Sequence, residues 1–360
     1  MQMGYWETAN QKLQALQNRG EAIILAIESS CDETAAAVVQ NGRTVLGNAV
    51  HTQIPLHVAY GGVVPEIASR NHVEMVRPVV ERALSEAGTT LDGVDAVAVT
   101  CGPGLVGALL VGLSFAKGLA FSKDLPFLGV NHIASHIAAN YLTDATWEPP
   151  FTCLVASGGH SHIVRVNAYD DFTLIGRTRD DAAGEAFDKV ARVLGLPYPG
   201  GPHLEELARS GDPLALHFHS AFNEGEGFDF SFSGIKTAVI NQIHTAQQRG
   251  ETLNRADVAA SFQHTVVEIL TEKAVRAAVS QSQDGHCPPR LALAGGVSAN
   301  RALRESLARR CAQAGVAFVC PDFRFCTDNA AMVGSAAFYK LMAGRIDPLS
   351  LNADPDLRIV

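Results

Sequence analysis

One pattern occurs twice along this sequence: a short apolar strand, a small polar turn, and then a pair of further strands. In the first half we expect these strands at residues 22–27, 35–40 and 44–51, and in the second half at residues 151–156, 162–166 and 172–177. The Asn41-Gly42 pair between two apolar runs is a strong signal of a β-hairpin. Because the pattern restarts after Pro149-Pro150, we interpret the chain as two halves built on one plan.

Helical segments are expected between and after these strands. We predict helices at residues 64–87, 105–121, 132–142, 300–314 and 326–342, with further strands at residues 96–100, 127–130 and 290–294. Strands that alternate with helices in this way indicate an α/β class.

The composition is that of a folded protein without a membrane span. Of the 360 residues, 47% are hydrophobic and 18% are charged, which is enough apolar material for substantial cores and too little charge for disorder. The longest apolar stretch, 108–121, is interrupted by glycine, serine and lysine and falls short of a span. The first twenty residues lack the apolar segment of a secretory signal, and the seven cysteines include no CxxC pair. We therefore expect a cytoplasmic protein with reduced thiols.

The net charge of −9 limits what the chain can bind unaided, because proteins that bind nucleic acid alone usually carry a basic balance. Either no nucleic acid is involved, or a local patch or a partner supplies the positive surface. Arg301, Arg304, Arg309 and Arg310 are candidates for such a patch, and a solvated helix face is an equal interpretation.

His132 and His136 are the first candidates for chemistry. They lie four residues apart on a predicted helix, so both imidazoles leave the same face, an arrangement that suits one divalent transition metal. The alternative is two unrelated histidines on a partly exposed helix. A zinc protease needs Glu directly after the first histidine as its general base, and Ile133 stands there, which disfavours that class.

The turn at residues 28–34 gathers three carboxylates and two hydroxyls directly after a strand. Such a turn can meet phosphates through backbone N–H groups and hydroxyls, with an acid as base or metal orienter. The alternative is an exposed acidic turn.

Two glycine turns each follow an apolar strand, at residues 155–160 and 294–300. Glycine lets the backbone approach a ligand closely, so two such turns indicate one phosphate-bearing ligand held by both. Each turn alone is explained equally well as a tight connection.

Aspartates at two expected helix starts have an ordinary structural interpretation as caps. Asp180 or Asp181 is expected to cap the helix that follows it, and Asp328 is expected to cap the last helix. Lys236, after a Ser/Gly turn, is consistent with an anion contact or with a capped helix start.

Taken together, eight segments in order resemble one family closely. They are ILAIESSCDETAAAVV (24–39), YGGVVPEIASRNH (60–72), NHIASHIAAN (131–140), SGGHS (157–161), DDAAGEAFDKVARVLGLPYPGGP (180–202), FSFSGIKTA (230–238), AGGVSAN (294–300) and CTDNAAMVG (326–334). The chain is thereby identified as similar to the TsaD family of tRNA threonylcarbamoyladenosine transferases, once described as glycoproteases. The resemblance covers residues 22–345.

The resemblance implies the fold of the actin-like ATPase, sugar kinase and heat-shock superfamily, with two duplicated α/β domains and a ligand cleft between them. We expect a variable extension at 1–21, a first domain at 22–150 that includes a C-terminal helix at 326–345, a second domain at 151–325, and a tail at 346–360.

The resemblance also implies roles for single residues. It assigns His132, His136 and Asp328 as metal ligands, with iron(II) as the expected metal and zinc as the second choice. It assigns Asp32 and Glu33 as catalytic candidates, Asp32 being the first choice as general base. It assigns substrate binding to Val155, Ala156, Ser157, Gly158, Gly159, Asp188, Gly201, Glu205 and Asn300. Many relatives carry Asp where Glu205 stands.

The implied reaction is acyl transfer. The donor would be threonylcarbamoyl-AMP, and the acceptor would be the exocyclic amine of the adenosine 3′ of the anticodon in tRNAs that read codons starting with A. The implied partners are a paralogous TsaB-type subunit and a small TsaE-type ATPase. Two other functions stay open: an ATP-dependent kinase or ATPase of the same superfamily, which would use magnesium on carboxylates and waters, and a non-catalytic scaffold of a tRNA-modification complex.

Overall fold

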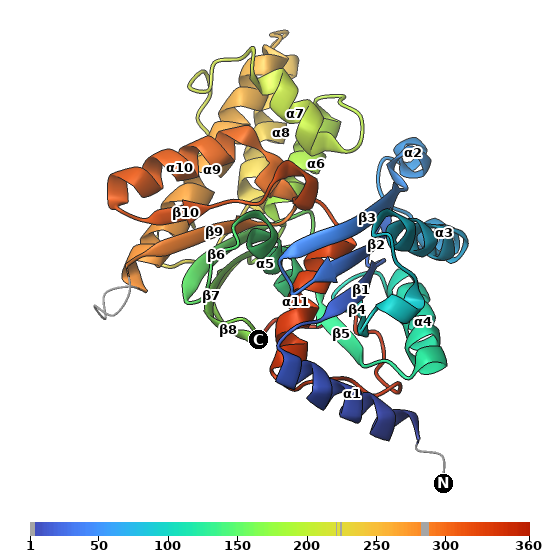
Figure 1. Cartoon of the computed structure of the whole chain (residues 1–360). Helices are drawn as coiled ribbons and strands as arrows, with labels where there is room; N and C mark the ends of the chain where they lie inside the picture. The colour runs from blue at the N-terminus through green and yellow to red at the C-terminus, as the bar shows by residue number, and fades with distance from the viewer. Residues whose placement is uncertain (1–3, 221, 224, 282–287) are drawn as a thin grey trace. The chain divides into compact units, whose positions relative to one another are not determined.

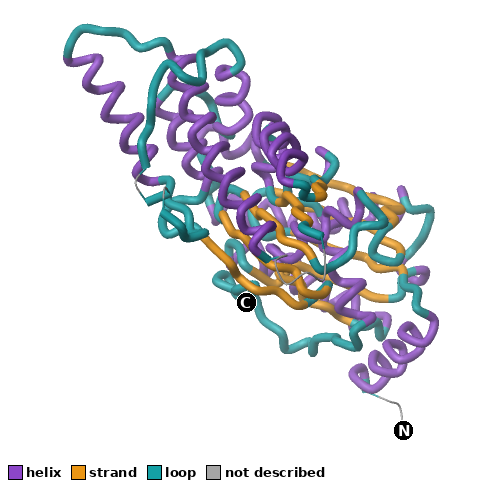
Figure 2. Tube along the Cα trace, turned by 90° about the vertical axis from the view of Figure 1, so that its left-hand side faces the viewer, coloured by secondary structure: helices purple, strands orange, loops and turns teal. Residues whose placement is uncertain are grey.

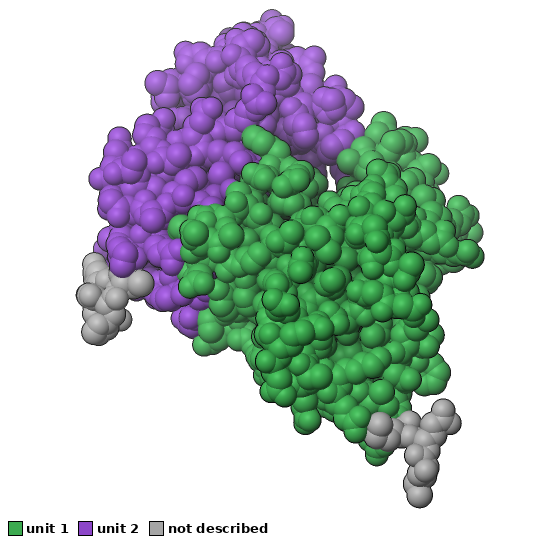
Figure 3. All heavy atoms as spheres, viewed as in Figure 1, with its two compact units in different colours: residues 1–148, 168–171, 321–360 green, residues 149–167, 172–320 purple. Residues whose placement is uncertain are grey.

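The chain forms two compact units, coloured separately in Figure 3. The structure, a computed structural model, describes residues 4–220, 222–223, 225–281 and 288–360. Unit 1 comprises residues 1–148, 168–171 and 321–360, and unit 2 comprises residues 149–167 and 172–320. The boundaries therefore lie at 148/149 and 320/321, against the expected 150 and 325. Of the seven cysteines, Cys287 lies outside the described residues, and no disulfide joins any two of the other six.

Unit 1 is built on a five-stranded sheet with the order β3-β2-β1-β4-β5. Its strands are β1 (Ile23–Glu28), β2 (Glu33–Gln40), β3 (Thr44–Thr52), β4 (Ala96–Gly102) and β5 (Phe127–Asn131). The first three strands are antiparallel, whereas β1, β4 and β5 run parallel. The predicted hairpin is confirmed: Asn41 and Gly42 both take positive φ angles, 53° and 65°, between β2 and β3.

Helices cover both faces of this sheet (Figure 1). They are α1 (Tyr5–Arg19), α2 (Ile54–His57), α3 (Pro65–Glu86), α4 (Val106–Lys123), α5 (His132–Thr143) and α11 (Ala330–Met342). Alternate residues of β1 face opposite layers, since Leu25 and Ile27 pack with α3 and α4 whereas Ile24 and Ala26 pack with α11. Among the described helices, α4 alone is apolar and long enough for a membrane span, and Leu109 and Leu113 on its buried face pack within unit 1.

The extension and the tail are both part of unit 1. In the extension, Leu13 and Leu16 of α1 pack into the cluster formed with α11. In the tail, Leu351 and Leu357 pack against the cluster formed with α3 and α4. Their apolar side chains explain why neither segment stands apart from the domain as the sequence division suggested.

Unit 2 repeats the sheet plan of unit 1, with the order β10-β9-β6-β7-β8. Its strands are β6 (Phe151–Ala156), β7 (Ser161–Ala168), β8 (Asp171–Arg177), β9 (Arg290–Ala294) and β10 (Ala317–Val319). The first strand is again central, antiparallel to the next strand and parallel to a later one. The predicted duplication is thereby confirmed at the level of topology.

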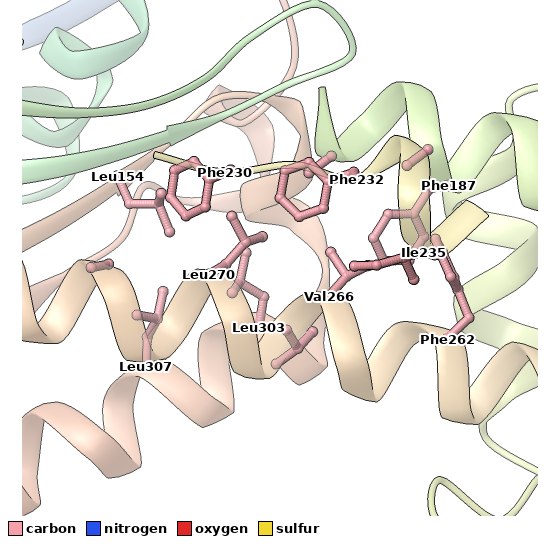
Figure 4. Close-up of a cluster of buried hydrophobic side chains, with 14 of the residues drawn as sticks. Leu154, Phe187, Phe230, Phe232, Ile235, Phe262, Val266, Leu270, Leu303 and Leu307 are labelled. Atoms are coloured by element: carbon pink, nitrogen blue, oxygen red, sulfur yellow. The ribbon is translucent and has the colours of Figure 1, made fainter. Parts of the chain in front are cut away.

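Helices, coloured purple in Figure 2, make up much of the chain, and those of unit 2 pack around an aromatic core (Figure 4). They are α6 (Ala183–Val193), α7 (Gly200–Ala208), α8 (Ser233–Gln248), α9 (Arg255–Ser280) and α10 (Arg301–Ala314). Phe187, Phe230 and Phe262 gather there with Leu270. We made no sequence prediction for the 26-residue helix α9, whose start is capped by Asn254.

Two predicted helix caps are wrong. Helix α6 begins after Ala182, and Asp180 instead binds the start of a different helix, α8: it accepts hydrogen bonds from the backbone N–H of Phe232 (2.8 Å) and of Ser233 (3.3 Å). Asp181 forms ion pairs with Lys189 and Lys236. The last helix begins at Ala330 rather than residue 326, and its cap is Asn329.

Candidate functional site

The histidine pair lies at the start of α5, directly after β5. Asn131 caps this helix, its side-chain oxygen accepting hydrogen bonds from Ile133 N (2.9 Å) and Ala134 N (3.2 Å). His132 and His136 are both buried, and their ring centroids are 4.6 Å apart. The helix therefore presents two imidazoles to one point inside unit 1.

Asp328 lies at the same point. Its Oδ1 is 3.2 Å from His136 Nε2 and 3.6 Å from His132 Nε2. Because Asn329 caps α11, accepting from Met332 N, the carboxylate of Asp328 is not needed for that role. The structure thus brings together the three residues that the resemblance assigned to a metal.

These three side chains fit a transition metal. The ligand atoms lie within 4.8 Å of one another, and ligands about 2.0–2.1 Å from a shared ion stand roughly 3–3.5 Å apart. Among the described residues, His136 Nδ1 has no partner and Nε2 makes no hydrogen bond beside its 3.2 Å contact with Asp328, although the ring is only 1% exposed. Two imidazoles and one carboxylate are a donor set for iron(II) or zinc and are unlike the all-oxygen sets of magnesium.

Glu28 orients His132 from behind. Glu28 is completely buried at the end of β1, where Oε2 lies 3.2 Å from His132 Nδ1 and accepts a 2.6 Å hydrogen bond from the Thr100 hydroxyl. Its other oxygen accepts from Ser30 N at 2.5 Å. When the ring is neutral, as a metal ligand must be, a carboxylate that holds Nδ1–H leaves Nε2 unprotonated and directed toward Asp328, as in carboxylate–histidine–metal sites.

Charge pairing inside this cluster shifts the pKa values of both Glu28 and His132. Burial alone would raise the pKa of Glu28, but the charge and hydrogen bond of His132 outweigh burial and lower the pKa. Burial opposes the imidazolium form of His132, yet the carboxylates of Asp328 and Glu28 raise its pKa to about 9. The buried pocket therefore already favours a cation next to its two carboxylates.

The acidic turn lies within electrostatic reach of this cluster. Burial, together with the carboxylates of Asp328 and Asp32, raises the pKa of Glu33 to about 10. The turn is held by His72, whose Nε2 lies 3.0 Å from the Cys31 carbonyl and whose Nδ1 lies 2.7 Å from the Thr34 hydroxyl. The exposed acidic turn considered as the alternative is excluded, since Asp32 is only 8% exposed.

A cavity in unit 2 collects five of the residues predicted to bind substrate. They are Gly158, Asp188, Gly201, Glu205 and Asn300, and the same wall also includes Gly184, Phe187 and the segment 296–299. Three helices begin here, because Gly184 lies in the first turn of α6, Gly201 lies in the first turn of α7, and Asn300 caps α10. The positive ends of three helix dipoles favour an anionic group such as a phosphate.

Three of these side chains already brace the cavity wall. Asp188 Oδ1 accepts from Gly200 N (2.8 Å) and Gly201 N (3.3 Å), and Glu205 accepts from Arg301 N (2.9 Å). Asn300 caps α10 through Leu303 N and donates to Gln263. Their first task is therefore to hold the glycine turn and the helix starts in place.

Only part of the predicted glycine loop after β6 is accessible to a ligand. Val155 and Ala156 are completely buried strand residues, so the accessible loop begins at Ser157. Ser157 N donates to His160 O at 2.7 Å, so this amide is already engaged within the loop. Within the described part of the chain, the amides of Gly158 and Gly159 have no hydrogen-bond partner. These two N–H groups stay available to an anion.

The sequence predicts Glu28 as part of the acidic turn without a role behind His132, and it predicts no role for Thr100 or His72. Glu28 stands at the end of an apolar strand, and a carboxylate there requires buried partners, a signal that was present. Its partners Thr100 and His132 lie 72 and 104 positions away, so no local sequence pattern identifies them.

Comparisons with known proteins point to one family. The family model described as TsaD, tRNA N6-adenosine threonylcarbamoyltransferase, matches residues 44–335. The tRNA N6-adenosine threonylcarbamoyltransferase of Clostridium perfringens (strain SM101) is 55% identical over 337 residues, which cover 94% of this chain and 98% of that protein. That of Clostridium botulinum (strain 657) is 54% identical, covering 93% and 97%.

Solved structures share the fold at low sequence identity. HypF of T. kodakarensis superposes with a TM-score of 0.58 at 14% identity, covering 89% of this chain and 47% of that chain. Component A of (R)-2-hydroxyglutaryl-CoA dehydratase from Acidaminococcus fermentans gives 0.52 at 12% identity, covering 90% and 98%. The chain has the predicted fold of the actin-like ATPase and sugar kinase superfamily.

Proposed function

The chain belongs to the TsaD family of tRNA N6-adenosine threonylcarbamoyltransferases, and on this premise we propose that it transfers the threonylcarbamoyl group from threonylcarbamoyl-AMP to tRNA. The acceptor is the exocyclic amine of the adenosine 3′ of the anticodon, in tRNAs that read codons starting with A. The observation that carries the proposal is the convergence of His132, His136 and Asp328 in a transferase of this family.

These three residues would hold one divalent metal, and we propose iron(II), with zinc as the second choice. Two histidines and one carboxylate are the donor set of non-haem iron sites. Bound there, the metal would supply Lewis-acid polarisation at the threonylcarbamoyl end of the donor. Glu28 keeps the His132 ring in the tautomer that such binding requires.

The chain's own groups supply the other elements of acyl transfer. The acceptor amine is a poor nucleophile because its lone pair is delocalised into the purine, so proton removal and positioning have to contribute. Asp32 accepts the proton in our proposal, and the raised pKa of Glu33 makes Glu33 the weaker base candidate at neutral pH. The N–H groups of Gly158 and Gly159 donate to the negative charge that develops during transfer.

The AMP part of the donor is assigned to the cavity of unit 2. The three helix N-termini favour its phosphate, and Asp188, Gly201 and Asn300 line the wall. Two proteins of the same fold have been solved with nucleotide: HypF in a phosphate- and nucleotide-bound form, and an activator of 2-hydroxyisocaproyl-CoA dehydratase with bound ADPNP.

The net negative charge of the chain supports the view that partner proteins help to bind the tRNA. Within unit 2, Arg304 donates to the Ser298 carbonyl and Arg310 pairs with Glu268, so two of the four candidate arginines are engaged internally. We therefore propose that a TsaB-type subunit and a TsaE-type ATPase complete the tRNA surface, in the cytoplasm.

A kinase or ATPase of the same superfamily is the second candidate, favoured by the helix N-termini around the cavity. Metal analysis of the purified protein separates the two. Iron or zinc at one per chain supports transfer, whereas magnesium alone supports the kinase and leaves the buried histidines without a use.

The direct test is threonylcarbamoyl transfer to unmodified tRNA, with partners supplied, in the presence and absence of a metal chelator. Asp32→Ala is expected to retain metal and donor binding and to lose transfer by about 10²–10⁴-fold, the usual contribution of a general base. Glu33→Gln is the matched variant in the same turn and should lose much less. If transfer survives in Asp32→Ala, Asp32 is not the base; if wild-type protein transfers equally with chelator, the metal site is not part of the reaction.

A further inference from the structure

The C-terminal tail is docked along the ends of β5 and β4. Asp347 joins it to β5, its N–H donating to Phe127 O and its carboxylate accepting from Gly129 N at 2.8 Å. Further along, Asp354 N donates to Cys101 O at 2.9 Å. The strand ends are shaped for this contact, because a Cβ atom on Gly102 would overlap the Asp354 carbonyl oxygen.

The tail then reaches the cap of the metal helix. The side-chain nitrogen of Asn131 donates to the carbonyl oxygens of Arg358 (3.1 Å) and Leu357 (3.4 Å). The oxygen of the same side chain accepts from the first amides of α5. One amide group therefore joins the tail to the helix turn that carries His132.

The tail also supports the turn that backs the histidines. Gly104 N donates to Pro355 O at 3.2 Å, and the next amide, Leu105 N, donates to Ser30 O at 2.8 Å. Ser30 Oγ lies 3.2 Å from His132 Nδ1. The loop and the turn lie close together here, since a Cβ on Gly104 would lie 2.7 Å from Ser30 O.

Two separate routes thus lead from residues 354–358 to the same imidazole, one through Asn131 and one through the loop 102–105 and Ser30. We propose that this segment, here called the tail strap, is a positioning element of the metal site, and that Asn131 is the residue through which it acts on α5. Neither the tail nor Asn131 touches a reacting atom. The proposal rests on the proposed function for its use in catalysis, and on the hydrogen bonds alone for its effect on His132.

The test measures Co²⁺ and Zn²⁺ binding to metal-free protein, by competition with a chromophoric chelator and by the visible absorption of the Co²⁺ complex. Asn131→Ser keeps an N-cap oxygen at the helix start but cannot reach the tail. A chain ending at Asp356 removes both carbonyls that Asn131 binds. A chain ending at Arg358 keeps them and is the matched control.

We expect Asn131→Ser and the chain ending at Asp356 each to weaken Co²⁺ binding by about 10-fold and to alter its absorption spectrum, within the 10–100-fold range of outer-shell changes. Their combination should be no weaker than either alone, because both break one contact. The chain ending at Arg358 should bind as the full chain does.

The proposal is overturned if Asn131→Ser binds Co²⁺ as wild type with an unchanged spectrum, or if the two effects multiply. Should the shortened chain fail to fold, Asn131→Ser in the full chain still decides. If wild-type protein binds no metal, the metal part of the proposed function fails instead. Hydrogen exchange of the amides of Ile133 and Ala134 then tests the strap by itself, since faster exchange in Asn131→Ser is required.

Discussion

Replacing Glu28 with Gln should weaken metal binding without changing the shape of the buried site. Glu28 Oε1 accepts from Ser30 N, and Oε2 accepts from Thr100 and faces His132 Nδ1. An amide has one oxygen for these two positions. If its oxygen stays at Ser30 N, its NH₂ group faces His132, Nδ1 must accept, and the ring proton moves to Nε2, the atom next to Asp328.

The opposite orientation is no better. The NH₂ group would then face Ser30 N, and a buried N–H group without an acceptor costs about 1–3 kcal/mol. The first orientation therefore removes the metal-binding tautomer of His132, and the second removes a buried hydrogen bond. We expect Glu28→Gln to weaken binding by about 10–100-fold, or about 1.4–2.8 kcal/mol, as for other outer-shell partners of metal-bound histidine.

The assay is competition of metal-free protein with a chromophoric chelator for Zn²⁺, with thermal unfolding of the metal-free forms as the check on folding. Glu33→Gln is the control, because it makes the same chemical change nearby without contacting His132. Binding by Glu28→Gln within twofold of wild type would refute the reasoning, as would an equal loss in both variants.

Two further changes probe the scaffold around the sites. Asp180→Ala should destabilise unit 2 by about 1–2 kcal/mol, because the start of α8 loses its hydrogen bonds to this carboxylate. Burial would raise the pKa of Asp180, but hydrogen bonds from serine hydroxyls outweigh it and lower the pKa. The stability that Asp180 contributes is therefore present above its unfolded pKa and is lost as pH falls through its folded pKa. Denaturant unfolding should therefore show the two proteins converging in acid, and a constant difference would contradict the account. Arg43→Met should destabilise unit 1 by about 2–4 kcal/mol, because the guanidinium donates to three backbone carbonyls within 141–147 and to the Tyr169 hydroxyl; a thermal unfolding midpoint unchanged within 1 °C would show that these bonds are replaced by water.

Much of this protein could be predicted from local sequence. The hairpin at Asn41-Gly42, the apolar strands and the repeat after Pro149-Pro150 follow from turn chemistry and periodicity, which act over a few residues. The spacing of His132 and His136 by itself determined that both rings leave one helix face. Segment resemblance added Asp328, which local pattern alone favoured as a helix cap.

Tertiary structure decided which partners those residues have. Asn329 caps α11 and leaves Asp328 for the histidines, and Asp180 binds the start of a helix 50 residues further along the chain rather than its own. Glu28 finds Thr100 and His132 across three parallel strands, and the tail meets Asn131 after more than 220 residues. Hydrogen bonds and charge pairs depend on distance in space, so partners this remote are determined only when the sheets and helices pack.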